Sequence, residues 1–229
     1  MNTGTGPGPI ARDGSPVEFY AALPPTGEPE VIRAVVPAGG SILELGSGAG
    51  RITRPLLDLG FDVVAVDECA DMLKQIRGAQ TVRSRIEDLA MDRTFDAVLL
   101  ASQLINTPDD AVRRGLLDCC RRHVAPGGQV LIQWVTPQAR AAWSPGLTRT
   151  AGEVTITLAE VTPIGPGLLA AVMRYETGGR VWTQSFTDRA LSEKDLAAAL
   201  ADSGLRLGRF LTPDRSWFTA YPTGRLRSS

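Results

Sequence analysis

ILELGSGAGRIT, residues 42–53, is the stretch that decides the fold of this chain of 229 residues. An apolar run ending at Leu45 is followed at once by three glycines at alternate positions and then by a helical pattern. Glycine has no Cβ, so such a turn lets the backbone contact a ligand. The spacing departs from the dinucleotide fingerprint G-x-G-x-x-G, because Arg51 stands where its third glycine is expected. The turn predicts a nucleotide-like ligand and argues against NAD.

Outward from this turn, short apolar or β-branched runs alternate with segments of helical period. That alternation is typical of a parallel sheet with helices on both faces. The expected strands are 41–45, 61–66, 80–83, 95–101, 128–135, 205–211 and 216–221, and the expected helices are 52–59, 69–77, 108–124 and a last one opened by Ser192. The predicted fold is therefore α/β, with a doubly wound, mostly parallel seven-stranded sheet.

The pattern changes after the fifth strand, where residues 150–190 contain three β-rich runs. The pair Gly178 and Gly179 separates the last two runs, as in a hairpin. We expect an antiparallel β insertion here that covers the substrate site. Residues 1–15 are rich in Gly, Pro and Thr and have little to bury, so we expect a disordered tail. Residues 16–229 are then expected to form a single domain.

Composition limits the partners of the chain. Its 24 basic and 25 acidic residues give a formal net charge of -1, which favours a small-molecule partner over nucleic acid. No apolar run reaches the roughly 20 residues of a membrane span, and the N-terminus lacks the features of a signal peptide, so we expect a cytoplasmic protein that does not bind membranes. The three cysteines lack the spacing of metal ligands, and we expect no metal.

A second motif supports the first. VVAVD, residues 63–67, reads as a buried strand that ends in a carboxylate about 20 positions after the glycines, where it can accept both hydroxyls of a ribose. The alternative is that Asp67 caps the helix that follows it. With Glu44 at the end of the first strand, the pattern E-x-G-x-G-x-G together with Asp67 resembles the class I (Rossmann-like) S-adenosylmethionine-dependent methyltransferases of the small-molecule type.

The resemblance implies S-adenosylmethionine as cofactor, with S-adenosylhomocysteine as product. It implies cofactor contacts from Tyr20, Glu44, Gly46, Ser47, Gly48, Gly50, Asp67, Glu68, Met72, Ile86, Glu87, Ser102 and Gln103. Arg85 stands where the family usually has an acid for the adenine amino group, so either Glu87 or a backbone amide near Ile86 is expected to read the adenine edge. Tyr20 packed on the first helix and Met72 in the core are the structural alternatives.

The expected chemistry needs little catalytic machinery, because a sulfonium donor is already activated and the protein must mainly align the acceptor and exclude water. The single histidine, His123, is expected to end a helix far from the site. Asp188 and Tyr175 are the weak candidates for catalysis, and Trp134, Trp143 and Trp182 are the candidates for substrate contact. The alternative for these aromatic residues is the core of the insertion or a dimer contact.

The leading hypothesis is methyl transfer to nitrogen, oxygen or carbon of a small molecule, of the kind that secondary metabolism uses. Three alternatives stay open: a cyclase or other non-methylating enzyme with the same donor, a non-catalytic protein that binds the cofactor, and a nicotinamide-dependent oxidoreductase. An exposed antiparallel edge in the insertion would also allow a homodimer.

Overall fold

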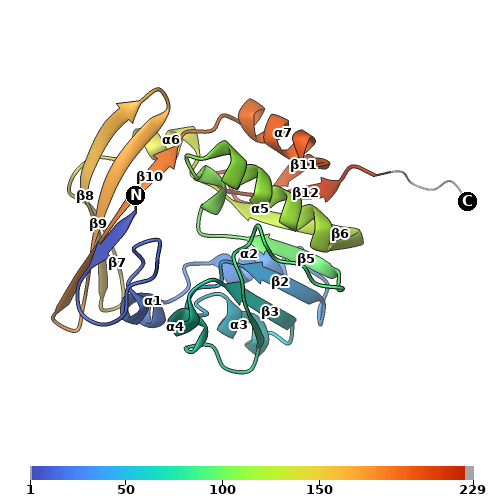
Figure 1. Ribbon diagram of the computed structural model, residues 1–229, viewed down its shortest axis with the longest axis horizontal. Helices are drawn as coiled ribbons and strands as arrows, with labels where there is room; N and C mark the ends of the chain where they lie inside the picture. The colour runs from blue at the N-terminus through green and yellow to red at the C-terminus, as the bar shows by residue number, and fades with distance from the viewer. Residues whose placement is uncertain (1, 225–229) are drawn as a thin grey trace, which may run out of the picture.

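The computed structural model describes residues 2–224 and contains two sheets (Figure 1). The larger sheet has seven strands in the order β11-β12-β6-β5-β2-β3-β4. Its strands are β2 (Ser41–Leu45), β3 (Asp62–Asp67), β4 (Gln80–Arg83), β5 (Phe95–Leu100), β6 (Val124–Gln133), β11 (Leu205–Phe210) and β12 (Trp217–Pro222). β12 runs antiparallel to both neighbours, and the other pairs are parallel. The predicted seven-stranded, mostly parallel sheet is confirmed.

Helices cover both faces of this sheet, since successive side chains of a central strand point to opposite sides. On β2, Leu43 and Leu45 pack in the cluster formed with α5 and α7, whereas Ile42 packs in the cluster with α2 and α3. The helices are α2 (Glu28–Arg33), α3 (Thr53–Asp58), α4 (Ala70–Leu73), α5 (Asp110–His123) and α7 (Glu193–Asp202). The carboxyl ends of the parallel strands are left open for a site.

The second sheet is antiparallel, with the order β1-β10-β9-β8-β7, and stands at the left of Figure 1. Its strands are β1 (Thr3–Thr5), β7 (Leu147–Ala151), β8 (Val154–Gly165), β9 (Leu168–Thr177) and β10 (Arg180–Arg189). Its inner face packs on Phe19 of α1 (Val17–Ala22). The insertion expected at 150–190 is thus present, begins at β7, and gains a strand from the N-terminus.

The N-terminal segment corrects one expectation. Residues 2–15 do not form a disordered tail, because β1 pairs with β10 in the register Thr3↔Ser185 and Thr5↔Thr183. A segment poor in apolar side chains is held here by backbone pairing and by glycines in close contact, which composition does not reveal. Met1 and residues 225–229, which the expected tail and domain include, lie outside the described residues.

Smaller differences concern helix ends. α5 is capped by Asp109, whose carboxylate accepts bonds from the amides of Ala111 and Val112, so Pro108 lies outside the helix. Ser192 opens α7 as predicted, and it forms a capping box with Asp195. α4 is shorter than the expected helix 69–77. None of the helices between residues 2 and 224 is long and apolar enough to cross a membrane.

Candidate cofactor and acceptor site

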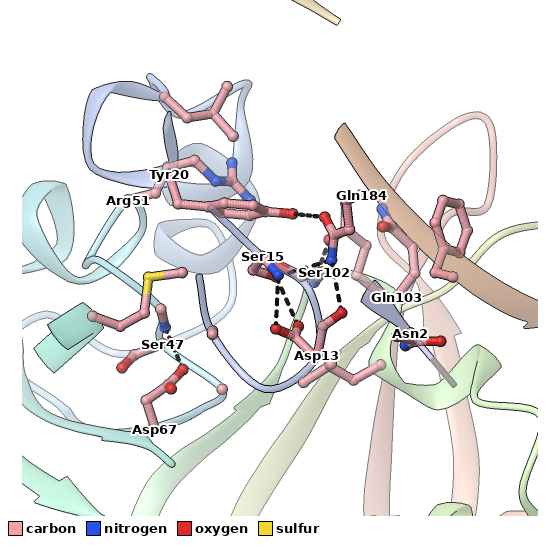
Figure 2. Close-up of a pocket in the computed structure, with 18 of the residues that line it drawn as sticks. Asn2, Asp13, Ser15, Tyr20, Ser47, Arg51, Asp67, Ser102, Gln103 and Gln184 are labelled. Carbon is pink, nitrogen blue, oxygen red and sulfur yellow. Dashed lines mark hydrogen bonds between the residues drawn. The ribbon is translucent and has the colours of Figure 1, made fainter. Parts of the chain in front are cut away.

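A cavity of about 770 Å³ lies between the carboxyl ends of the parallel strands and the inner face of the antiparallel sheet. This volume is within the range of small-molecule sites. Its floor consists of the turns that follow β2, β3, β4, β5 and β6, and its roof consists of side chains of β8, β9 and β10. Residues of the N-terminal segment close one side (Figure 2). Segments from the whole length of the chain thus meet at one site.

The three glycines of the turn are needed for different physical reasons. All adopt positive φ, at 70° for Gly46, 54° for Gly48 and 84° for Gly50. A Cβ on Gly46 would stand 2.7 Å from Leu104 Cδ1, and one on Gly50 would stand 2.8 Å from Ile76 Cγ1. Gly46 and Gly48 line the cavity, but Gly50 does not. The expected cofactor contact of Gly50 is therefore corrected: this glycine allows the close packing on Ile76.

Ser47 is the clearest sign of a ligand. Ser47 is 7% exposed and lines the cavity, yet within residues 2–224 its Oγ has no hydrogen-bond partner. Its amide donates to the carbonyl of Val66 (2.9 Å), which fixes the turn on β3. Leaving a buried hydroxyl unpaired costs free energy, so such a group points to a ligand that satisfies it.

Asp67 ends β3 beside the glycine turn. Its Oδ2 accepts a bond from the Gly48 amide (2.8 Å), and its Oδ1 accepts one from the Cys69 amide (2.8 Å) in front of α4. Burial raises the pKa of Asp67, and these two amide bonds oppose the rise. The carboxylate thus bonds the amide of Cys69, the N-cap residue of α4, without capping the helix itself, and it keeps lone pairs that face the cavity.

Glu44 and an ion pair form a buried wall of the cavity. Glu44 is 2% exposed and accepts a bond from Thr53 Oγ1 (2.5 Å), and burial raises its pKa to about 7. Nearby, Arg51 pairs with Glu28 of α2, and both line the cavity. In the sequence, Arg51 served only to exclude a dinucleotide, and Glu28 carries no local signal that could have identified it.

The residues expected at the adenine end come together. Glu68, Met72, Ile86 and Glu87 all line the cavity. Met72 also packs in a buried cluster, so its two proposed roles are compatible. Glu87 pairs with Arg85, from Nη2 to Oε1 at 2.9 Å, and both candidates for the adenine edge stay predictions.

The turn after β5 is strained. Ser102 and Gln103 have φ of 55° and 56°, a region that non-glycine residues rarely adopt, and both line the cavity. The Ser102 amide donates to Gln133 Oε1 (2.8 Å), which holds the turn against the end of β6. Backbone strain of this kind is concentrated at functional sites.

Tyr20 lies where α1 meets the roof of the cavity. Its hydroxyl donates to Gln184 Oε1 (3.2 Å), and the Tyr175 hydroxyl donates to the same atom (2.7 Å). Burial is the largest cause that raises the pKa of both tyrosines. The Tyr20 ring also packs edge-on against Phe19, so it is both a cavity residue and a packed aromatic. The sequence analysis missed Gln184, although its alternation with Trp182 on β10 is a signal that it faces inward.

The tryptophans separate into two groups. Trp143 lines the cavity and packs edge-on against Phe186, with ring centroids 6.1 Å apart. Trp134 does not line this cavity, because its ring is buried against β12 and its Nε1 donates to the Arg215 carbonyl (2.7 Å). Trp182 does not line it either: its ring is buried under the N-terminal segment. The expected substrate contacts of Trp134 and Trp182 are corrected accordingly.

The catalytic candidates have structural partners. Asp188 lines the cavity and accepts a bond from Arg140 Nε (2.6 Å), which attaches α6 (Pro137–Ala141) to β10. Burial raises the pKa of Asp188, and Arg140 opposes the rise. Its role as a base stays a prediction. His123 is buried at the end of α5, where its ring bonds to the Cys119 carbonyl and the Met91 amide, outside the cavity.

The sheet order, the glycine turn and Asp67 define a Rossmann-like protein with a site of the nucleotide-cofactor type. The family described as "Methyltransferase domain" matches residues 42–128. An uncharacterized methyltransferase of Mycobacterium tuberculosis is 33% identical over 184 residues, which cover 78% of this chain and 72% of the relative. The chain therefore belongs to the methyltransferase domain family.

Solved structures support the same fold. The sugar N-methyltransferase KedS8 from Streptoalloteichus aligns with a TM-score of 0.68 at 21% identity, over 87% of this chain and 88% of that protein. CalS10, an amino pentose methyltransferase from Micromonospora echinaspora solved with S-adenosylmethionine bound, aligns with a TM-score of 0.63 at 19% identity, over 90% and 92%. At these identities the similarity is one of fold.

Proposed function

We propose that the protein transfers a methyl group from S-adenosylmethionine to nitrogen, oxygen or carbon of a small molecule, held between the two sheets. The observation that carries this proposal is the Ser47 Oγ, which is buried in the cavity beside Asp67 and has no hydrogen-bond partner within residues 2–224. A hydroxyl without a partner and a carboxylate with free lone pairs, on one glycine turn, suit the polar groups of an adenosyl amino acid.

The residues around the turn would hold the donor in an extended pose. Asp67 is suited to the ribose hydroxyls, with Met72 and Ile86 against the adenine ring and Ser102 with Gln103 at the amino acid end. When bound, the donor supplies a methyl group on a positively charged sulfur, which needs no further activation. The protein aligns the acceptor with that methyl group and excludes water by closing the roof over it.

A small acceptor suits the shape of the cavity. The part of it below β8, β9 and β10 is bounded by Trp143, Phe186 and Tyr175, so this part of the cavity suits a compact molecule. The near-zero net charge of -1 favours no polyanion. The similarity to the sugar N-methyltransferase KedS8 and to CalS10, solved with S-adenosylmethionine, supports both the donor and the size of the acceptor.

Calorimetric titration tests the donor first. We expect S-adenosylmethionine and S-adenosylhomocysteine to bind, and NAD to show no heat at the same concentrations. Ser47→Ala should weaken the binding of S-adenosylhomocysteine by about fivefold to tenfold, because one hydrogen bond contributes about 1 kcal/mol. Preferred binding of NAD would overturn the donor assignment. Incubation with methyl-labelled donor and a panel of metabolites then separates transfer from mere binding.

A further inference from the structure

The segment of residues 2–16, here called the N-terminal clasp, is built into the site. β1 pairs with β10, the Trp182 Nε1 donates to the Pro7 carbonyl (2.7 Å), and the Val17 amide donates to the Pro9 carbonyl (3.0 Å). Inside the cavity, Gln184 Nε2 donates to Ser15 Oγ (3.0 Å). These bonds bring a segment with little apolar content onto the roof of the cavity.

The clasp also depends on its glycines. A Cβ on Gly4 would stand 2.0 Å from the Gly14 carbonyl oxygen, and one on Gly14 would stand 2.5 Å from the backbone of Thr3. A Cβ on Gly6 would stand 2.4 Å from the Trp182 ring. The glycine-rich composition is therefore explained by tight packing within the clasp and against β10, and not by disorder.

The clasp places one carboxylate in the cavity. Asp13 lines it, and its two oxygens accept bonds from the Ser15 amide (3.0 Å) and the Ser15 hydroxyl (2.7 Å). In the view of Figure 2 the carboxylate lies between the side with Ser47 and Asp67 and the side with Gln103. The two bonds fix its direction and leave further lone pairs free toward the cavity.

Asp13 differs from three other acids of the cavity in having no arginine partner within residues 2–224, a property that it shares with Glu44 and Asp67. Glu28, Glu87 and Asp188 each pair with an arginine at 2.9 Å or closer, whereas no ion pair of Asp13 is found within residues 2–224. The charge of Asp13 acts on residues on both sides of the cavity. Burial is the main cause of the raised pKa of Tyr20 and of Asp67, and the charge of Asp13 raises both further. A lone carboxylate between the donor side and the roof would attract a positively charged group.

We propose, on the basis of the proposed function, that Asp13 selects a basic amine as acceptor by accepting an N–H bond from the nitrogen that is methylated. The bound ammonium first releases one proton to water, which frees the nitrogen lone pair. As the new N–C bond forms with that lone pair, the C–S bond breaks and its electrons stay on sulfur. The positive charge thus passes from sulfur to nitrogen, and a fixed carboxylate beside that nitrogen stabilises the charge as it develops. The proton of the methylated ammonium is released to water afterwards.

The test compares amines with alcohols of the same skeleton. Benzylamine with benzyl alcohol, and cyclohexylamine with cyclohexanol, are incubated with methyl-labelled S-adenosylmethionine and the full chain. We expect each amine to be methylated faster than its alcohol. Asp13→Asn should lower the amine rate by about tenfold or more, in line with a hydrogen bond to a charged group. The affinity for S-adenosylhomocysteine should change by less than about twofold.

Two further variants separate the effect of the Asp13 carboxylate from a general loss of charge. Asp92→Asn removes the same charge from an exposed residue outside the cavity and should leave the rates and the affinity unchanged. Gly4→Ala alters no group in the cavity, yet by displacing the clasp it should lower the amine rate as Asp13→Asn does, with donor binding retained.

The outcomes separate this proposal from the proposed function. If the protein binds neither S-adenosylmethionine nor S-adenosylhomocysteine, the proposed function fails. If it binds them but methylates no amine faster than its alcohol, or if Asp13→Asn keeps the amine rate, the selection by Asp13 is overturned. If Asp13→Asn lowers the affinity for S-adenosylhomocysteine as much as it lowers the amine rate, Asp13 binds the donor. That result would also overturn the proposed selection of the acceptor by Asp13.

Discussion

Replacing Glu44 with glutamine tests the electrostatics of the deepest part of the site. The carboxyl is 2% exposed, and although Thr53 and Arg51 favour its charged form, burial raises its pKa from 4.5 to about 7. In the unfolded chain the group returns to its ordinary pKa. This difference makes the stability of the protein depend on pH, with a sign opposite to that of a typical salt-bridged acid.

Below pH 4.5 the carboxyl is protonated in both states, so it contributes no pH dependence. Between pH 4.5 and about 7 the unfolded state loses the proton while the folded state keeps it. The free energy of unfolding therefore falls as pH rises through this window, by about 3 kcal/mol in total, and it is flat above pH 7. Glutamine has no proton to lose, so in Glu44→Gln this contribution is absent.

Urea unfolding at half-unit steps from pH 4.5 to 8, followed by tryptophan fluorescence, gives the free energy of unfolding of both proteins. Relative to wild type, Glu44→Gln should gain about 3 kcal/mol between the two ends of the range. Glu28→Gln is the matched control. Burial raises the pKa of Glu28, but Arg51 and backbone amide bonds together lower it more, so the net pKa lies below 4.5. Its contribution to stability is present above pH 4.5 and lost as pH falls. A difference between wild type and Glu44→Gln that stays constant with pH would refute the reasoning.

Three other substitutions test the site and the turn. Asp67→Ala should weaken the binding of S-adenosylhomocysteine about 100-fold in calorimetry, because two bonds to one carboxylate are lost, and an affinity within threefold of wild type would remove Asp67 from the ribose site. Gly50→Ala should lower the free energy of unfolding by about 1 kcal/mol more than Gly60→Ala. Both glycines have φ of 84°, but a Cβ meets Ile76 only at Gly50, so equal losses in urea unfolding would contradict the packing explanation. Asp188→Asn should leave the pH profile of methyl transfer unchanged, because its arginine partner gives it a structural role, and a lost acidic limb would show that it acts as a base.

The architecture of the large sheet could be predicted from the sequence because its signals are local. A central parallel strand is buried on both faces and is read as an apolar run, and the helix that follows has its own period. The glycine turn and Asp67 are local sequence signals of the same kind. They lie at the ends of two neighbouring strands, β2 and β3, so the sequence already places them at one edge of the sheet.

The tryptophans show where local signals stop. Trp134 directly follows the carboxyl end of β6, which faces the cavity. Its position along the chain gives no indication that the ring turns away from the cavity toward Phe218. Trp182 lies on β10 at a buried position, yet the surface that it meets is the N-terminal clasp and not the substrate cavity. In both cases the neighbour that decides the orientation of the ring is remote in sequence.

The sequence by itself therefore determined the sheet, the turn that approaches a ligand and the carboxylate beside it, because each depends on residues within one strand, turn and helix. Only the tertiary structure decided that residues 2–16 close the cavity. Thr3 pairs with Ser185, and the carboxylate of Asp13 is directed by Ser15, which is in turn bonded to Gln184. Contacts across such separations leave no periodic pattern in the chain, since they depend on how the N-terminal clasp pairs with and packs on β10.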